Sequence, residues 1–204
     1  MNHDRDHSSP VLLTFRPLTP QRWQDLQSLF GERGACGGCW CMWWRLTRAE
    51  FSKRKGPQNK AAFKKIVAAG ETPGVLAYAE QQPVGWCAVA PRVSYPSLER
   101  SKTLARVDGR AVWSVTCLFV ARPFRRRGIS VQLLRAAATH AHSRGAATVE
   151  GYPVEPRTPS MPDVFAWTGL ASAFHRAGFR EVLRRSRTRP IMRLQFGAEA
   201  IEQK

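Results

Sequence analysis

The part of the sequence best suited to chemistry is a short basic run that ends in a glycine. Residues 125–130 read Arg-Arg-Arg-Gly-Ile-Ser, between an apolar, β-prone segment at 111–120 and a helical pattern at 129–144. Backbone N–H groups at a helix N-terminus lack intrahelical partners, and together with the helix dipole they attract anions. Gly128 lets a ligand approach the backbone, and guanidinium groups offer forked donors for phosphate. The run therefore predicts a phosphate or pyrophosphate site, with a solvated basic turn as the alternative.

The whole chain is strongly basic, and the surplus lies mostly in its second half. Its 204 residues include 32 Lys and Arg against 15 Asp and Glu, a net charge of +17. Residues 100–204 hold 19 basic and 7 acidic residues, a net charge of +12. This surplus predicts attraction to nucleic acid, acidic membranes or phosphorylated cofactors, unless it is only an arginine-rich ordinary surface. The 43% hydrophobic and 23% charged content is typical of a globular domain and argues against collagen, coiled coil or complete disorder.

Targeting signals are not evident in the sequence. No run of about 18 apolar residues predicts a membrane span, and the polar N-terminal residues do not resemble a secretion signal. Five cysteines, an odd number, favour reduced thiols over a disulfide framework. We therefore expect a cytoplasmic protein with no membrane partner. We expect a loose tail at 1–9, one domain at 10–198 and a second tail at 199–204.

Hydrophobic periodicity and turn residues predict a single α/β domain. The unbroken apolar character of 111–120 is typical of a strand that is buried on both faces. Gly56-Pro57 should divide the helical pattern of 47–69 into two short helices. Strands are predicted at 11–15, 74–80, 84–90, 111–120, 147–152, 179–184 and 191–196. Helices are predicted at 20–30, 47–69, 129–144 and 164–177, and 91–110 is predicted to be a connection.

Two motifs resemble the signatures of one superfamily. Residues 125–130 resemble the Arg/Gln-x-x-Gly-x-Gly/Ala motif that opens a helix in GNAT N-acetyltransferases, with Ser130 as the last small residue. Residues 171–179, Ala-Ser-Ala-Phe-His-Arg-Ala-Gly-Phe, resemble their second signature, a helix that ends in Gly-Phe before a strand. The order of elements extends the resemblance over most of the chain. It implies a mixed six- to seven-stranded sheet that splays between its fourth and fifth strands, with helices on both faces.

The resemblance implies that acetyl-CoA, or another acyl-CoA, is the donor and that no metal is needed. The pantetheine arm would pair with the backbone of Leu118, Phe119 and Val120 like an added strand. Amides from Arg126 to Ser130 would hold the pyrophosphate, and a loop arginine would meet the 3′-phosphate. These loop residues are Arg125, Arg126, Arg127, Gly128, Ile129 and Ser130.

The proton chemistry is less clearly encoded. Many family members protonate the departing thiolate with a tyrosine at the position of Phe174, which would border the cofactor here but cannot donate. Tyr152 could substitute as the acid, although a CoA thiolate also leaves fairly well without help. Glu150 is the only carboxylate in a predicted central strand, so it is a candidate base, directly or through water. Its alternative role is that of a structural partner for an arginine.

A Cys/Trp-rich segment at 35–46 is the candidate acceptor wall, because the resemblance places it over the acceptor site. Trp40, Trp43 and Trp44 would supply flat surfaces, and Arg45 could bind an anionic group. Arg92 ends a predicted strand near the same side. The spacing of Cys36, Cys39 and Cys41 leaves a zinc site, a redox pair or plain core packing as alternatives.

The combined prediction is an acyl-CoA-dependent N-acyltransferase, most simply one that transfers acetyl to a primary amine of a small molecule. One alternative acceptor is an amine bound to nucleic acid, such as an aminoacyl-tRNA, which would use the basic second half. The other alternative is a non-catalytic module that binds acyl-CoA or nucleic acid. The sequence leaves a homodimer open.

Overall fold

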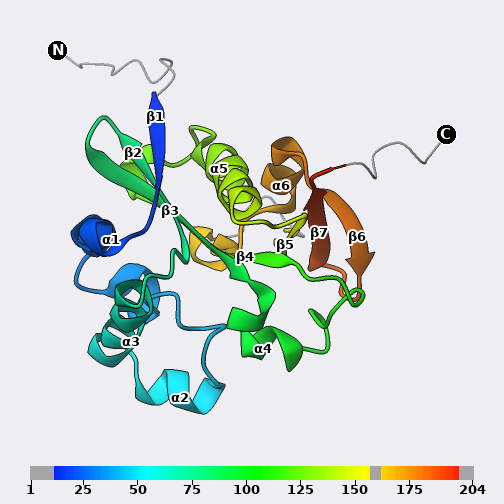
Figure 1. Cartoon of the computed structure of the whole chain (residues 1–204), viewed down its shortest axis with the longest axis horizontal. Helices are drawn as coiled ribbons and strands as arrows, with labels where there is room; N and C mark the ends of the chain where they lie inside the picture. The colour runs from blue at the N-terminus through cyan, green and yellow to red at the C-terminus, as the bar shows by residue number, and fades with distance from the viewer. Residues whose placement is uncertain (1–11, 157–161, 198–204) are drawn as a thin grey trace.

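A computed structural model describes residues 12–156 and 162–197, which form one mixed sheet with helices on both faces (Figure 1). The seven strands lie in the order β1-β2-β3-β4-β5-β7-β6. Neighbours are antiparallel except for β4 and β5, which are parallel. The strands are β1 (Leu13–Pro17), β2 (Gly74–Ala79), β3 (Gln82–Pro91), β4 (Trp113–Val120), β5 (Thr148–Gly151), β6 (Arg180–Arg184) and β7 (Pro190–Gln195).

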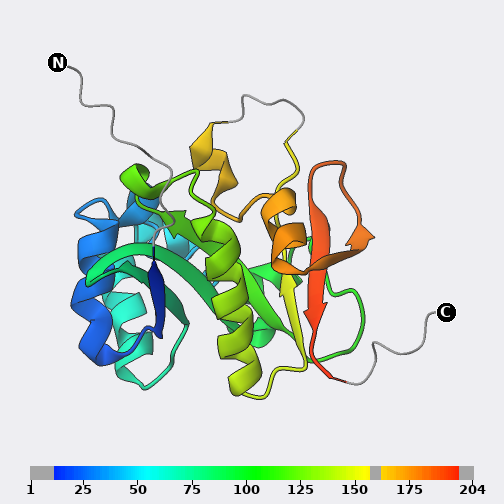
Figure 2. The ribbon, with the colours of Figure 1, turned by 90° about the horizontal axis from the view of Figure 1, so that it is seen from above.

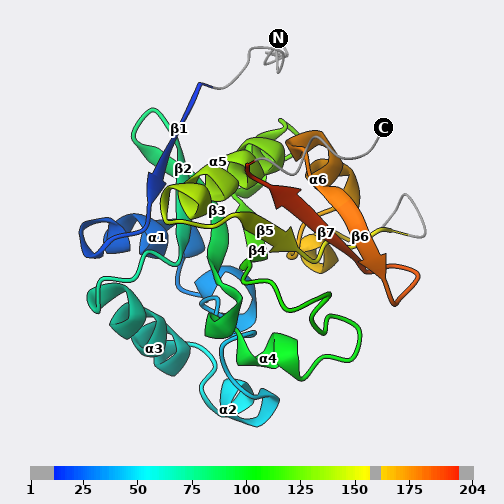
Figure 3. The ribbon, with the colours of Figure 1, turned by 45° about the vertical axis from the view of Figure 1, so that its right-hand side comes forward.

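Helices α5 and α6 cover one face of the sheet, and α1, α3 and α4 pack on the other (Figures 2 and 3). Side chains alternate along β3, so Cys87 faces α5 whereas Trp86 faces α1 and α3. None of the helices in the described ranges has the length and apolar character needed to cross a membrane. The helices are α1 (Trp23–Phe30), α2 (Arg48–Lys53), α3 (Pro57–Ala68), α4 (Pro96–Glu99), α5 (Ile129–Ser143) and α6 (Ala171–Ala177).

The sheet opens between β4 and β5, which confirms the predicted splay. Thr116 is an extra residue on β4, because Ala88 pairs with Cys117 while the next residue, Val89, pairs with Val115. Such a bulge bends a strand and increases its twist. Pairing between β4 and β5 ends at Val115, one residue before the bulge. The last four residues of β4 therefore diverge from β5.

One predicted element is wrong: residues 164–177 are not a continuous helix. A 3₁₀ turn at Asp163–Ala166 is followed by a break, and α6 begins only at Ala171. Gly169 at φ +85° makes the break, and the Trp167 carbonyl accepts a 2.7 Å hydrogen bond from Leu118 N–H. The apolar residues of this segment therefore do not form one stripe of a helix. They pack in the gap beside β4 instead. The connection at 91–110 also contains the unpredicted helix α4.

Gly151, at the end of β5, is required by the packing of α6. A Cβ atom at this position would lie 2.1 Å from Cε1 of Phe174, whose side chain is fully buried. We expect Gly151→Ala to destabilise the fold by about 1–3 kcal/mol, which would lower Tm by roughly 2–10 °C. Thermal unfolding followed by circular dichroism measures this difference.

Gly109→Ala is the matched control, because open space surrounds that position. Its Tm should stay close to that of the unmodified protein. Equal Tm values for the two variants would show that Phe174 does not fix the end of β5.

Candidate active site

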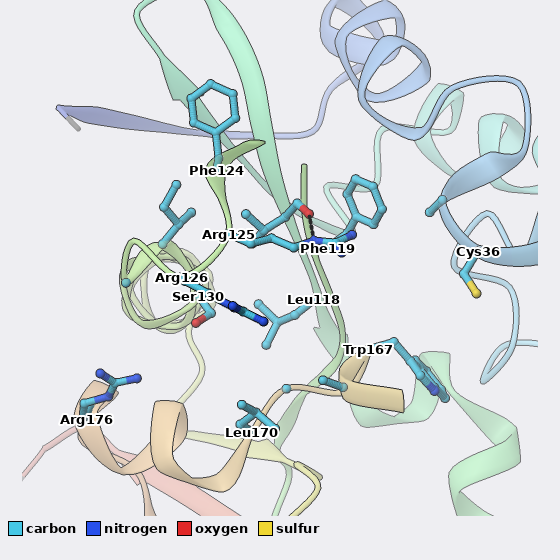
Figure 4. A pocket seen from close by; sticks show the side chains of 16 residues that line it. Cys36, Leu118, Phe119, Phe124, Arg125, Arg126, Ser130, Trp167, Leu170 and Arg176 are labelled. Carbon is cyan, nitrogen blue, oxygen red and sulfur yellow. Dashed lines mark hydrogen bonds between the residues drawn. The ribbon is translucent and has the colours of Figure 1, made fainter. Parts of the chain in front are cut away.

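A cavity of about 510 Å³ lies where the splayed end of β4 meets the start of α5 (Figure 4). We call it the basic cleft. It brings together most of the residues predicted to bind the cofactor, and it adds Arg176 of α6, which sequence reasoning missed. The predicted residues that line it are Leu118, Phe119, Val120, Arg125, Arg126, Gly128, Ile129 and Ser130.

The loop before α5 has the backbone of an anion site. Gly128 at φ +73° caps the 15-residue helix, and Arg126, though not a glycine, also has a positive φ of 63°. Left-handed residues in such a turn direct successive N–H groups into one concavity, at the positive end of the helix dipole. Arg126, Ser130 and Arg176 lie around one end of the cleft, and Trp167 and Cys36 lie at the other (Figure 4). Among the described residues, no acidic side chain lines it.

Two of the predicted cofactor residues do not line the cleft. The Arg127 guanidinium lies over the ring of Phe124, 5.9 Å from its centroid, on the loop itself. Phe174 is fully buried beneath Gly151 and Gly169 and belongs to the core on the α5 side.

The edge of β4 that faces the cleft is already bonded. Leu118 N–H donates to the Trp167 carbonyl at 2.7 Å, and the Arg125 Nε–H donates to the Val120 carbonyl at 3.0 Å. A ligand that pairs with β4 at Leu118 must therefore displace the Trp167 carbonyl. The sequence did not predict that the Trp167 carbonyl occupies the edge of β4, because it did not predict the break at Gly169.

A second cavity of about 280 Å³ adjoins the first. Both are lined by Ala35, Cys36, Leu118, Phe119 and Trp167, so the two meet at the splayed strand. We call the second cavity the aromatic pocket. Its other lining residues are Gly37, Cys39, Cys41, Trp43, Trp44, Phe51, Lys55, Thr116 and Cys117.

The predicted acceptor residues divide between this pocket and the core. Trp43 and Trp44 line the pocket. Trp40 is buried and stacks on Trp23 with centroids 6.0 Å apart, so it lies in the core on the α1 side. The Arg45 guanidinium lies 4.8 Å from the Tyr95 ring centroid, and Arg45 is not among the described residues that line the pocket.

Arg92, Glu150 and Tyr152 form one buried cluster, away from the lining of both cavities. Arg92 Nη1 donates to Glu150 Oε1 at 3.1 Å, and the Tyr152 hydroxyl donates to the same oxygen at 2.7 Å. Arg193 Nε donates to Glu150 Oε2 at 2.7 Å. Burial, and then the charge of Glu150, raise the pKa of Tyr152 well above its usual value. These bonds favour the structural alternative for Glu150 over the role of a base.

The cluster also fixes the connection that contains α4. Arg193 forms a two-bond ion pair with Asp108, and its hydrogen bond lowers the pKa of that carboxyl to about 2. Arg92 binds Glu99 at 2.9 Å and the Leu104 carbonyl at 2.7 Å. The end of β3, β5, β7 and residues 99–108 are thus tied together through two arginines.

The cysteines at 36–41 lie in a loop with strained backbone. Ala35, Trp40 and Cys41 all have positive φ, and the Gly38 carbonyl accepts bonds from Gly56 N–H and Asn59 Nδ2. Within 12–156 and 162–197, no three His, Cys, Asp or Glu side chains are arranged to hold a metal.

These three thiols differ in exposure: Cys36 is exposed, Cys39 is half-buried and Cys41 is buried. Burial raises the pKa of Cys39 to about 11. A hydrogen bond with Cys41, and then burial, raise the pKa of the Cys117 thiol well above its usual value.

Sequence comparison assigns the family. Residues 40–162 match the family described as "Acetyltransferase (GNAT) family". The chain belongs to the GNAT acetyltransferase family. This membership supports the prediction that the chain is an acyltransferase. No curated protein sequence matches the chain significantly.

Solved structures of GNAT proteins share the fold. A GNAT-family acetyltransferase from Streptococcus agalactiae aligns with a TM-score of 0.53 at 12% identity, over 91% of this chain and 96% of that chain. YncA from Salmonella typhimurium, solved with its cofactor acetyl-CoA, aligns with a TM-score of 0.51 at 13% identity, over 92% and 96%. The PaiA N-acetyltransferase of Thermoplasma acidophilum, solved with coenzyme A, aligns with a TM-score of 0.50 at 13% identity, over 91% and 99%.

Replacing Glu150 separates its two roles. Glu150→Gln would leave Arg92 and Arg193 without a buried counter-charge, a change that typically costs about 3–5 kcal/mol. We expect Tm to fall by roughly 10 °C or more, as measured by thermal unfolding. Glu181→Gln is the control, because that carboxylate pairs with Arg184 at the surface, where an ion pair contributes about 1 kcal/mol or less.

The opposite pattern would contradict a structural role. If Glu150→Gln kept its Tm but lost nearly all turnover, Glu150 would act as the base.

Proposed function

We propose that this GNAT protein transfers the acetyl group of acetyl-CoA to a primary amine of a small molecule. The observation that carries the proposal is the basic cleft, in which the bulged end of β4 and the anion-binding start of α5 line one cavity. An extended donor that ends in phosphates fits such a cavity, because one half offers strand backbone and the other offers N–H groups and guanidinium groups.

The residues of the cleft divide the binding among them. The N–H groups from Arg126 to Ser130 would hold the pyrophosphate, and Arg125, Arg126 and Arg176 would neutralise the phosphates. The pantetheine would run along 118–120 after the Trp167 carbonyl moves from Leu118 N–H. The thioester would then lie at the junction of the cleft with the aromatic pocket.

The reaction would need little proton chemistry from the chain. The neutral amine would attack the thioester carbonyl carbon, a C–N bond would form and the C–S bond would break. The attacking nitrogen would lose one proton, and the departing CoA thiolate would take up a proton directly or through water. No carboxylate among the described residues lines either cavity. Apolar walls and nearby cations lower the pKa of a bound ammonium, so the acceptor would lose its proton to water and react as the free amine.

A nucleic-acid-bound acceptor is a second candidate, because of the net charge of +17. Many of the arginines that suggested it have partners inside the protein. Arg184 binds Glu155 and Glu181, and Arg185 donates to the carbonyls of Ala105 and Arg106. Arg189 binds Thr168, and Arg193 binds Glu150 and Asp108. These bonds give many of the arginines a role inside the fold and so weaken the argument from charge for a nucleic-acid-bound acceptor.

Donor binding is tested by thermal stability. Acetyl-CoA at about 100 times its Kd should stabilise the protein by about 2.7 kcal/mol, which would raise Tm by roughly 5–10 °C. Gly128→Trp would fill the cleft and should abolish both this shift and acetyl transfer to a panel of small amines, followed by mass spectrometry of the product.

Gly145→Trp is the matched control, because Gly145 also has a positive φ but lies beyond the other end of α5. It should lose stability yet keep the acetyl-CoA shift. The absence of any shift in the unmodified protein would refute the proposed donor.

Alkylation of Cys36 reports on the junction of the two cavities. Iodoacetamide should modify Cys36 before Cys39 and Cys117, because those two thiols stay protonated at neutral pH. Burial raises the pKa of Cys39, and the hydrogen bond with Cys41, followed by burial, raises the pKa of Cys117. We expect acetyl-CoA to slow modification of Cys36 several-fold, as measured by peptide mass spectrometry. Gly128→Trp should show no protection, and equal rates with and without acetyl-CoA in the unmodified protein would place the thioester elsewhere.

A further inference from the structure

The aromatic pocket has the lining of a site for a flat, apolar molecule. Trp44 stacks on Trp167 with centroids 6.0 Å apart and ring planes at 29°. Trp43 meets Trp167 at 6.3 Å and 79°, and meets Phe51 at 5.0 Å and 83°. Because one pair of these rings is stacked and two pairs meet edge to face, the rings hold one another in place and present both faces and edges to an occupant.

The charge around the pocket is positive. Lys55 is the one charged residue among those described as lining it. The Arg48 guanidinium lies 5.4 Å from the Trp43 ring centroid and so already occupies a cation–π position on that ring. Trp44 Nε1 and Arg45 Nη2 are buried donors that find no acceptor among the described residues. The surroundings are therefore rich in donors and cations, and none of the described residues that line the pocket carries a carboxylate.

These observations decide between two kinds of acceptor. A polyamine or another alkylammonium ion would enter the field of Lys55 and Arg48 without a carboxylate to balance it. An aromatic ring bearing a carboxylate would stack on the indoles and pair with Lys55. An amine attached to such a ring is weakly basic, so it is already neutral and needs no base from the chain.

We propose that the aromatic pocket binds an aromatic amine that carries a carboxylate, with its ring against Trp43 and Trp167 and its carboxylate on Lys55. This assignment rests on the proposed function, because it names the acceptor for the same junction. The amine would face Leu118 and Phe119, where the pocket opens into the basic cleft. Lys55 is thereby a specificity residue rather than a catalytic one.

Calorimetric titration with two probes that differ only in charge tests the assignment. We expect 4-aminobenzoate to bind roughly threefold to tenfold more tightly than 4-aminobenzamide, the range of a partly exposed ion pair. Lys55→Met should remove this difference and leave the Kd of the amide unchanged. Lys53→Met, two residues away on α2 and outside the pocket lining, should preserve it.

The outcomes separate this inference from the proposed donor. Equal Kd values for the two probes, or preferential acetylation of spermidine over 4-aminobenzoate, would overturn the pocket assignment even if acetyl-CoA raises Tm. Suppose instead that 4-aminobenzoate binds more tightly than the amide only when Lys55 is present, and that acetyl-CoA does not shift Tm. The proposed donor would then be refuted, whereas the assignment of the aromatic pocket would be supported.

Discussion

The extra residue at Thr116 is the constraint on which both cavities depend. It bends β4 where pairing with β5 ends, so 117–120 diverge from β5 while they stay paired with β3, and they present a backbone edge to the opening. The basic loop and α5 follow this strand directly, which sets an anion site beside that edge. The aromatic pocket is lined by Leu118 and Phe119 of the same strand end. Without the bulge, β5 could continue along β4 and close the site.

A buried set of ion pairs connects β5, on the other side of the opening from β4, to its neighbours in the fold. Glu150 on β5 joins Arg92 at the end of β3 and Arg193 on β7. Removing one partner of such a cluster leaves a buried charge uncompensated, which makes the arrangement of strands specific. Several arginines that suggest a polyanion partner in the sequence are bound in this way or to backbone carbonyls. Part of the excess of arginine therefore stabilises the fold and need not indicate a polyanionic partner.

Local patterns predicted the elements and the cofactor loop, because these depend on residues close in sequence. The turn at Gly128, the apolar strand before it and the break at Gly56-Pro57 are local features. The contacts of Glu150 and Tyr152 with Arg92, about 60 residues away along the chain, could not be predicted in this way. The same holds for Arg176 and for the Trp167 segment, whose apolar spacing is typical of a helix but whose residues pack beside β4.

The most direct test of the account is a crystal structure of the protein with bound coenzyme A. The pyrophosphate should lie on the N–H groups at the start of α5, with the pantetheine along 118–120 and the Trp167 carbonyl displaced from Leu118 N–H. The sulfur should lie near Cys36 and Phe119, at the mouth of the aromatic pocket. A coenzyme bound away from the splayed end of β4, or a sulfur beside Glu150 and Tyr152, would contradict the account.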